Sequence, residues 1–150
     1  MAPTRPADLT VPADRQRLEQ AFLNLIKNAL EAIGASGEIH IKATRQRVTR
    51  DIAAAGPGGN FTFLGKCFIG GEAVDIEIRD NGPGIPPEVL PRIFDPFFTT
   101  KDVGRGMGLG LFIVYEIIEE HNGCISVQSA AGHGTVFHIR LPLESTVESL

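Results

Sequence analysis

The sequence predicts an α+β domain in which a mixed sheet packs against helices on one face. Segments with helical or strand periodicity follow in the order helix, strand, strand, helix, strand, strand. The last two strands are separated by a short glycine-containing turn, which is typical of an antiparallel hairpin rather than a βαβ crossover. The length of 150 residues, with 43% hydrophobic and 21% charged residues, suits one globular domain with its own core.

The first half of the chain contains one long helix and one strand, followed by a segment whose pattern is ambiguous. Residues 1–14 are interpreted as a lead-in with one candidate edge strand. Asp14 is a typical helix N-cap, and residues 15–33 have the apolar spacing of a helix. Residues 38–48 alternate as a strand. Residues 50–71 are compatible with a hairpin insertion or a mobile loop, and the sequence does not decide between them.

The second half is expected to contain a strand, a turn or two of helix, a loop, a long helix and two strands. These elements lie at 74–80, 86–93, 95–105, 107–121, 124–129 and 135–141. Asn122-Gly123 is expected to close the long helix. The predicted organisation is therefore a lead-in (1–14), one domain (15–143) and a polar tail (144–150).

Composition and charge exclude several function classes. The net charge is −4 without a basic block, which argues against nucleic-acid binding. The longest apolar run, nine residues from Met107, is too short to span a bilayer, and no secretory leader is visible. Cys67 and Cys124 lack C-x-x-C spacing, so we interpret both as small apolar thiols in a reducing compartment. These features predict a cytoplasmic domain without membrane contact.

The predicted helix 15–33 has a polar face that contains two asparagines one turn apart. Asn24 and Asn28 share this face with Gln20, Lys27 and Glu31. Asparagine is a poor residue for a helix interior, and a solvated face would favour charged residues. Two stacked amide oxygens suit a hard cation such as Mg²⁺ or a positioned water. The alternative, an ordinary solvated face, remains open from this pattern alone.

A glycine-rich loop follows the strand that ends at Asp80. Asn81-Gly82 would favour a hairpin, but three prolines between 83 and 87 would remove donors from a returning strand. Gly82 and Gly84 instead allow the backbone to approach a flat ligand closely. Asp80 could accept a hydrogen bond from an exocyclic amine such as that of adenine.

Two further motifs precede the second long helix. Phe94, Phe97 and Phe98 lie within five residues, and taken alone they favour a small apolar cluster that pins a loop. Lys101 and four glycines at alternate positions over 104–110 then open the helix. Such a helix N-terminus offers free N–H groups and a positive dipole end to a phosphate. The spacing fits neither a dinucleotide fingerprint nor a P-loop.

Taken in order, these motifs resemble the boxes of sensor histidine kinases over about residues 9–142. The resemblance rests on Gln20-x-x-x-Asn24-Leu25-x-x-Asn28-Ala29-x-x-Ala32 (N box), Asp80-Asn81-Gly82-Pro83-Gly84-Ile85 (first glycine box), Phe94-Asp95-Pro96-Phe97-Phe98-Thr99-Thr100-Lys101 (F box), Gly104-Arg105-Gly106-Met107-Gly108-Leu109-Gly110-Leu111 (second glycine box) and Gly132-His133-Gly134-Thr135. The F box is most similar to that of the nitrogen-regulation type.

The resemblance implies a Bergerat (GHKL) fold, a two-layer α/β sandwich with a mixed five-stranded sheet and about three helices, and it implies ATP and Mg²⁺. Asp80 would bind the adenine amine directly, and Asn28 would ligate Mg²⁺. A mobile lid over about 95–110 would hold the triphosphate. The residues implied to contact ATP are Asn24, Lys27, Asn28, Asp80, Gly82, Gly84, Ile85, Phe94, Thr100, Lys101, Arg105, Gly106, Met107, Gly108, Leu109, Gly110 and Thr135, with Asn24, Asn28 and Lys101 implied to be catalytic.

Three departures from the wider superfamily refine this expectation. Its ATP-hydrolysing branch has a general-base Glu at the place of Asn24, and an amide cannot take a proton at neutral pH. Many histidine kinases have a Lys where this chain has Glu31. None of the four histidines lies in a phosphoacceptor motif.

The resemblance therefore implies the ATP-binding catalytic domain of a sensor kinase whose parent protein could be membrane-anchored. It would transfer the γ-phosphoryl group to a histidine on a separate dimerisation domain, for relay to the receiver domain of a response regulator. Two alternatives stay open at this point. One is a stand-alone serine kinase of the anti-sigma-factor type, and the other is a catalytically silent nucleotide-binding module that regulates a partner.

Overall fold

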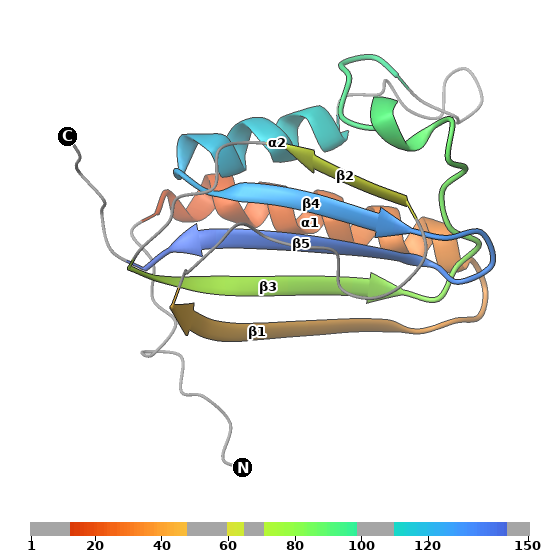
Figure 1. Cartoon of the computed structure of the whole chain (residues 1–150), viewed down its shortest axis with the longest axis horizontal. Helices are drawn as coiled ribbons and strands as arrows, with labels where there is room; N and C mark the ends of the chain where they lie inside the picture. Colours follow the sequence, from red (N-terminus) through yellow and green to blue (C-terminus); the bar gives the residue numbers. More distant parts are fainter. Residues whose placement is uncertain (1–12, 48–59, 65–70, 99–109, 144–150) are drawn as a thin grey trace, which may run out of the picture.

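A computed structural model describes residues 13–47, 71–98 and 110–143, and the backbone of 60–64. Two helices, α1 (Arg15–Ile33) and α2 (Gly110–Glu120), pack against each other on one face of a single sheet (Figure 1). The strands and the short 3-10 helix are β1 (Ile39–Arg47), β2 (Asn60–Leu64), β3 (Glu72–Asp80), η2 (Leu90–Arg92), β4 (Cys124–Ser129) and β5 (Thr135–Pro142).

The sheet has the strand order β1-β3-β5-β4-β2, and all four of these pairings are antiparallel. The α+β class is confirmed, but the expected mixed sheet is wrong for the described strands. Within the described ranges the structure has two α-helices and one 3-10 helix, where about three helices were expected. Residues 60–64 form an edge strand on β4, so a local hairpin does not describe them.

Helix α1 has the predicted bounds because both of its ends are capped locally. The Asp14 side chain accepts a hydrogen bond from the Arg17 backbone N–H at 3.2 Å, and Gly34 donates back to the Leu30 carbonyl at 3.2 Å. At the end of α2, Asn122 adopts a left-handed conformation and Gly123 donates to the Ile118 carbonyl at 3.0 Å. The predicted closure by Asn122-Gly123 is confirmed.

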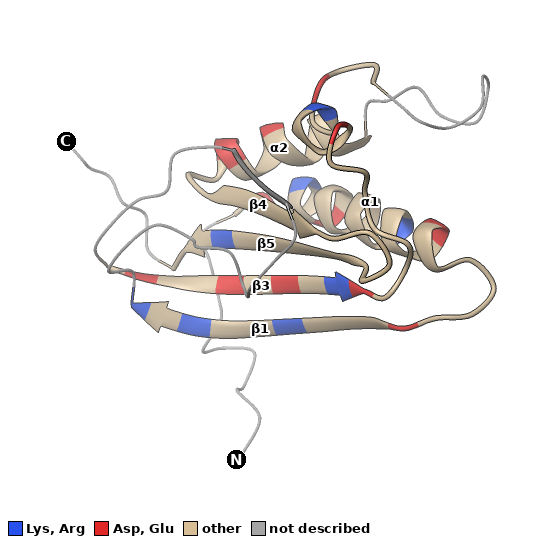
Figure 2. Ribbon diagram, turned by 45° about the vertical axis from the view of Figure 1, so that its right-hand side comes forward, with Lys and Arg blue, Asp and Glu red and all other residues tan. Residues whose placement is uncertain are grey.

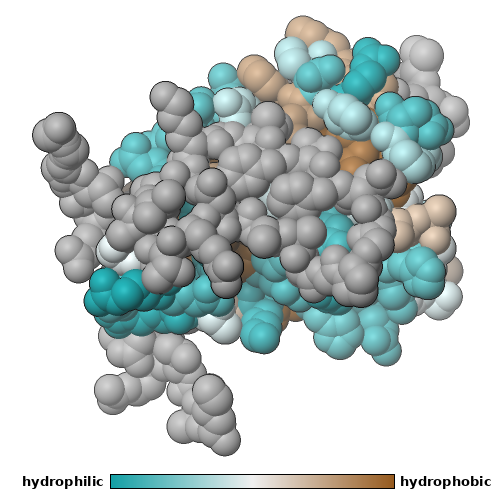
Figure 3. All heavy atoms as spheres, in the orientation of Figure 1, coloured by the Kyte–Doolittle hydropathy of each residue, from teal (hydrophilic) through white to brown (hydrophobic). Residues whose placement is uncertain are grey.

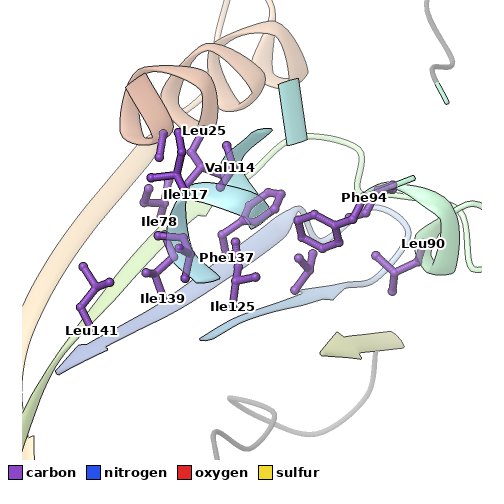
Figure 4. Packing of buried hydrophobic residues seen from close by; sticks show 14 residues of the cluster. Leu25, Ile78, Leu90, Phe94, Val114, Ile117, Ile125, Phe137, Ile139 and Leu141 are labelled. Carbon is purple, nitrogen blue, oxygen red and sulfur yellow. The ribbon is translucent and has the colours of Figure 1, made fainter. Parts of the chain in front are cut away.

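The core lies between the two helices and the sheet (Figure 4). Alternate residues of β3, β4 and β5 point toward the helices, as the period of two in a strand requires. The labelled core side chains in Figure 4 are Leu25 from α1, Val114 and Ile117 from α2, Ile78, Ile125, Phe137, Ile139 and Leu141 from the sheet, and Leu90 and Phe94 from the segment that leaves β3. This last pair anchors the start of the loop that follows β3.

The opposite face of the sheet carries a network of charged side chains. Arg140 donates two hydrogen bonds to Asp75, at 2.7 and 2.9 Å, and His138 lies 3.0 Å from Glu77. Burial alone would raise the pKa of Glu77, but the hydrogen bonds from Arg79 and His138 outweigh it and lower that pKa. Charge therefore holds β3 to β5 on the side away from the helices.

The edge strand β1 is basic and runs beside the acidic strand β3 (Figure 2). Arg45 and Arg47 both pair with Glu72. Hydrophilic side chains follow the edge of the molecule where Figure 1 places β1 (Figure 3). Charged side chains on an edge strand disfavour pairing with a second molecule.

Two expectations from composition concern the cysteines and the membrane. Cys124 is fully buried and disulfide-bonded, so the interpretation of this residue as a free apolar thiol is wrong. Cys67, the other cysteine of the chain, lies outside the described residues. None of the helices in the described ranges is long and apolar enough to cross a membrane.

Candidate functional site

The Asp80 carboxylate lies at the last position of β3, and only 5% of the residue is exposed. Its Oδ1 accepts a hydrogen bond from the Gly82 backbone N–H at 2.9 Å, and the Thr135 backbone N–H also donates to the carboxylate. Burial raises the pKa of Asp80, and these two N–H groups only partly oppose the effect. The result is a shielded carboxylate with acceptor capacity left for a ligand donor.

The loop after Asp80 is interlocked with the β4–β5 turn through two glycines with positive φ. A Cβ at Gly84 (φ +83°) would lie 2.4 Å from the Ala130 carbonyl oxygen, and one at Gly134 (φ +82°) would lie 2.0 Å from the Asp80 carbonyl oxygen. Neither position has room for a side chain, and both conformations favour glycine. Gly132 also donates to the Pro83 carbonyl at 2.9 Å. The close fit fixes the backbone around Asp80.

Ser129 connects these two loops through its side chain. Its Oγ lies 2.7 Å from the Ile85 backbone nitrogen, 3.0 Å from the Gly134 carbonyl oxygen and 3.1 Å from Thr135 Oγ1. The sequence interpretation included Gly84, Ile85 and Thr135 but missed Ser129. A signal was present, because a serine stands at an inward-facing position of an apolar strand immediately before a glycine turn.

The polar face of α1 meets the start of α2. The Asn24 side-chain amide donates to the Gly110 carbonyl oxygen at 3.5 Å. Asn28 lies one turn further along the same side and is half-buried, whereas Lys27 is exposed. Within the described residues the Asn28 amide has no hydrogen-bond partner, so its oxygen is available to a ligand. Of the two asparagines, Asn24 therefore lies against the beginning of α2.

The start of α1 is also joined to the end of α2. The Asp14 backbone N–H donates to His121 Nε2 at 3.0 Å, and Arg17 forms a bidentate ion pair with Glu120 at 2.9 and 3.0 Å. Contacts at both ends of α2 therefore hold it against the first half of α1.

The residues of the F box divide between the core and the surface. Phe94 is buried in the core cluster, as the alternative of an apolar anchor suggested. Phe97 is 69% exposed and has a φ of +67°, which is strained for a side chain of this size. The Arg92 guanidinium lies 4.5 Å from the centroid of the Phe98 ring.

Asn81 has a structural role that the motif alone does not indicate. Its Oδ1 accepts a hydrogen bond from the Glu38 backbone N–H at 2.8 Å, so it ties the end of β3 to the turn before β1. The remaining predicted phosphate-binding residues lie outside the described ranges. They are Thr100, Lys101, Arg105, Gly106, Met107, Gly108 and Leu109.

The donor set fits a nucleotide better than a protein-caged metal ion. In the described part of the chain, no group of three or more His, Cys, Asp or Glu side chains could hold a metal. One amide oxygen at Asn28 suits Mg²⁺, because this ion keeps waters and binds mainly through the phosphates of its ligand. A buried carboxylate between glycine turns suits the amine edge of a base.

The fold is that of an ATP-binding domain of the histidine kinase type. Residues 13–145 match the family model of the histidine kinase-, DNA gyrase B- and HSP90-like ATPases, and the chain belongs to this family.

Similar proteins include bacterial sensor kinases. The chain is 42% identical over 133 residues to the sensor kinase CckA of Brucella abortus, and the match covers 88% of this chain and 13% of CckA. It is 41% identical over 132 residues to the sensory histidine kinase/phosphatase NtrB of Rhizobium meliloti, and this match covers 87% of the chain and 31% of NtrB. The chain thus spans less than a third of the length of either relative. The resemblance to sensor histidine kinases is confirmed.

Solved structures agree with this assignment. The catalytic domain of the histidine kinase ThkA superposes with a TM-score of 0.62 at 35% identity, covering 89% of this chain and 71% of ThkA's. Full-length ShkA in complex with AMPPNP superposes with a TM-score of 0.62 at 28% identity, covering 93% of this chain and 24% of ShkA's.

Proposed function

We propose that this chain is the catalytic domain of a sensor kinase that transfers the γ-phosphoryl group of ATP to a histidine on a separate dimerisation domain. The proposal is carried by the buried Asp80 carboxylate, which two backbone N–H groups hold at the end of β3. The similarity to named histidine kinases over most of this chain supports the reaction class.

The base of ATP would lie against the end of β3 and the start of β5. Asp80 and Thr135 are cross-strand partners in the sheet register, so their side chains are neighbours on one face. The carboxylate would accept a hydrogen bond from the adenine amine. Gly82, Gly84 and Ile85 would line the adjoining loop, whose backbone packs closely against the Ala32 and Ala130 carbonyls because the two glycines have no Cβ.

The phosphates would lie between α1 and the N-terminus of α2. Asn28 would hold Mg²⁺ through its amide oxygen, and the ion would neutralise phosphate charge. Asn24 and Lys27 would contact the same end of the nucleotide from α1. Lys101, Arg105 and the amides of Gly106–Gly110 are proposed to complete the phosphate site. The work of these residues is positioning and charge stabilisation, which dominate phosphoryl transfer.

Two features favour transfer to a partner over hydrolysis by the domain alone. Asn24 cannot act as a general base toward water, because an amide does not accept a proton at neutral pH. The histidines lie in β1 (His40), at the end of α2 (His121), in the β4–β5 turn (His133) and in β5 (His138). His121 and His138 are already hydrogen-bonded within the domain. We therefore propose that the acceptor histidine and the response regulator are separate partners.

The test is incubation of the chain with γ-labelled ATP and Mg²⁺, with and without the dimerisation domain of a related kinase such as NtrB. We expect no label on the chain alone, slow phosphate release, and acid-labile, base-stable label on the added domain. Rapid phosphate release by the chain alone would point to the hydrolytic branch of the family. An acid-stable phosphoprotein would point to a serine kinase.

A further inference from the structure

We propose that Ser129 is a positioning residue that sets the base specificity of the nucleotide site by fixing the direction of the Thr135 hydroxyl. The proposal rests on the proposed function, in which the base lies beside Asp80 and Thr135. It adds a residue that does not touch the ligand but controls one that does.

Only one arrangement of protons turns all three contacts of Ser129 Oγ into hydrogen bonds. The Ile85 backbone nitrogen, at 2.7 Å, can only donate, and the Gly134 carbonyl oxygen, at 3.0 Å, can only accept. When the single hydroxyl proton of Ser129 points at Gly134, all three contacts are hydrogen bonds, whereas a proton directed at Thr135 would leave the Ser129 and Gly134 oxygens 3.0 Å apart without one. Thr135 Oγ1, at 3.1 Å, must then be the donor in its contact with Ser129. In this arrangement Ser129 donates once, accepts twice and has no capacity left.

This arrangement determines what Thr135 can offer a ligand. Because its hydroxyl proton is directed to Ser129, Thr135 Oγ1 presents only lone pairs to the space beside Asp80. The ionised Asp80 carboxylate also presents only lone pairs. Two neighbouring acceptors favour a base edge that carries a donor, as the amine of adenine does. They disfavour a base with a carbonyl at that place, because acceptors would then face each other.

Burial protects the arrangement from water. Ser129 is 1% exposed and Thr135 is 5% exposed. The close approach of Gly84 to Ala130, where a Cβ would lie 2.4 Å from a carbonyl oxygen, brings the Ile85 N–H within reach of Ser129. A solvent molecule therefore cannot replace the Ser129 hydroxyl without moving the loop.

The experiment measures the affinities of the whole chain for ATP and for inosine triphosphate, which has a carbonyl where adenine has the amine. In Ser129→Ala the Thr135 hydroxyl proton is released and can donate to that carbonyl. We expect the preference for ATP over inosine triphosphate to fall roughly three- to tenfold, the size of one hydrogen bond. A merely structural role would weaken both nucleotides alike and leave the preference unchanged.

A second variant and a matched control complete the test. In the Thr135→Val background, Ser129→Ala should have no further effect on the preference, since Ser129 acts through Thr135. Thr135→Val alone should lower the preference for ATP over inosine triphosphate. This variant tests the role of Thr135 even if Ser129→Ala does not fold. Ser126→Ala is the control, because Ser126 is also 1% exposed but lies on the opposite face of β4, and its Oγ has no hydrogen-bond partner among the residues that the structure describes. It should leave the preference unchanged.

Several outcomes would overturn the proposal. One is an unchanged preference in either Ser129→Ala or Thr135→Val. Another is a change in the nucleotide preference when Ser129→Ala is added to Thr135→Val. Such a change would show that Ser129 acts through the Ile85 loop and not through Thr135. Failure of the unmodified chain to bind either nucleotide would overturn the proposed function itself. Selective binding by the unmodified chain, with no change in the variants, would overturn only the role of Ser129.

Discussion

At the end of β3, the Asp80 carboxylate is nearly closed off from solvent while two backbone N–H groups hold it in place. Its folded-state pKa is raised above the usual 3.8 because burial outweighs these hydrogen bonds. The ionised group therefore lowers stability at pH values above that raised pKa, and the loss disappears as the pH falls through it. A residue that weakens the fold at neutral pH is typical of a binding site.

Asp80→Asn should separate binding from stability. Asn keeps an oxygen for the Gly82 N–H but turns a donor toward the adenine amine, so ATP affinity should fall at least about tenfold. The melting temperature at pH 7 should be equal or higher, because the buried charge is gone, and the difference from the unmodified chain should shrink as the pH approaches 3.8. Calorimetry and thermal unfolding at pH 7 and pH 4 test this. Unmodified ATP affinity would refute the adenine assignment.

Asn28→Ala should affect the metal-dependent part of nucleotide binding. Mg²⁺ takes few protein ligands, so loss of one amide oxygen should weaken Mg²⁺–ATP binding by roughly tenfold and metal-free ADP binding by less than about twofold. Titrations with and without Mg²⁺ measure both effects. Leu23→Ala is the control, since this exposed residue lies on the same helix. Equal weakening under both conditions would indicate that Asn28 only supports the helix.

At the scale of elements, two arginine–carboxylate pairs each join two neighbouring elements, and one pair is much more buried than the other. The Asp75–Arg140 pair joins β3 to β5, with side chains that are 17% and 9% exposed. The Arg17–Glu120 pair joins α1 to α2, with side chains that are 36% and 53% exposed. The geometry is bidentate in both, so burial is the main difference between them.

Removing one carboxylate from each pair should therefore have unequal effects. Asp75→Ala should lower the free energy of unfolding by about 3 kcal/mol, because Arg140 would stay buried without two of its hydrogen bonds. Glu120→Ala should lower it by less than about 1 kcal/mol, because water screens and replaces an exposed pair. Urea unfolding of both variants provides the comparison. Similar losses would show that burial is not the deciding factor.

The elements that the sequence predicted well are those with local signals. Helix α1 has its predicted bounds because the Asp14 cap and the stop at Gly34 are encoded next to the helix. Strand β2 was not recognised, because its pairing with β4 lies more than 60 positions away and its own segment is rich in Ala and Gly. The expected mixed sheet failed for a related reason, since strand direction depends on pairings between distant segments.

For the candidate site, too, the sequence indicated residues with local signals and missed those whose partners are distant in the chain. Asp80 was proposed because a carboxylate before a glycine loop is a local pattern, and the structure buries this carboxylate. Its contact with adenine stays a prediction. Ser129 was missed because its partners, Ile85 and Gly134, come together only in the folded chain. Phe94 was placed in the ATP site by resemblance, whereas the structure describes it as a core residue. Its contact with ATP stays a prediction.

At the scale of the molecule, β5, the last of the described strands, lies at the centre of the sheet. β5 pairs with β3 on one side and with β4 on the other. It supplies Phe137, Ile139 and Leu141 to the core and Thr135 to the candidate site. Without β5, the β1–β3 pair and the β4–β2 pair would have no strand between them.

Truncation of the chain after Gly134 should therefore abolish cooperative folding. The shortened chain would lose the central ladder and a large share of the buried apolar surface, which is more than the usual stability of a domain can tolerate. Circular dichroism during urea unfolding should show no cooperative transition, and ATP binding should be absent. Truncation after Leu143, which retains all of β5, is the control and should keep both properties.

The position of β5 also has a consequence for biosynthesis. A ribosome releases this strand after the other helices and strands described here, so the nascent chain holds the β1–β3 pair and the β4–β2 pair before the strand that joins them is present. Until then, the apolar inner faces of these segments stay exposed and depend on protection from aggregation. The nucleotide site, which needs Thr135 beside Asp80, cannot form earlier. This domain should therefore become competent to bind ATP only at the end of its own translation.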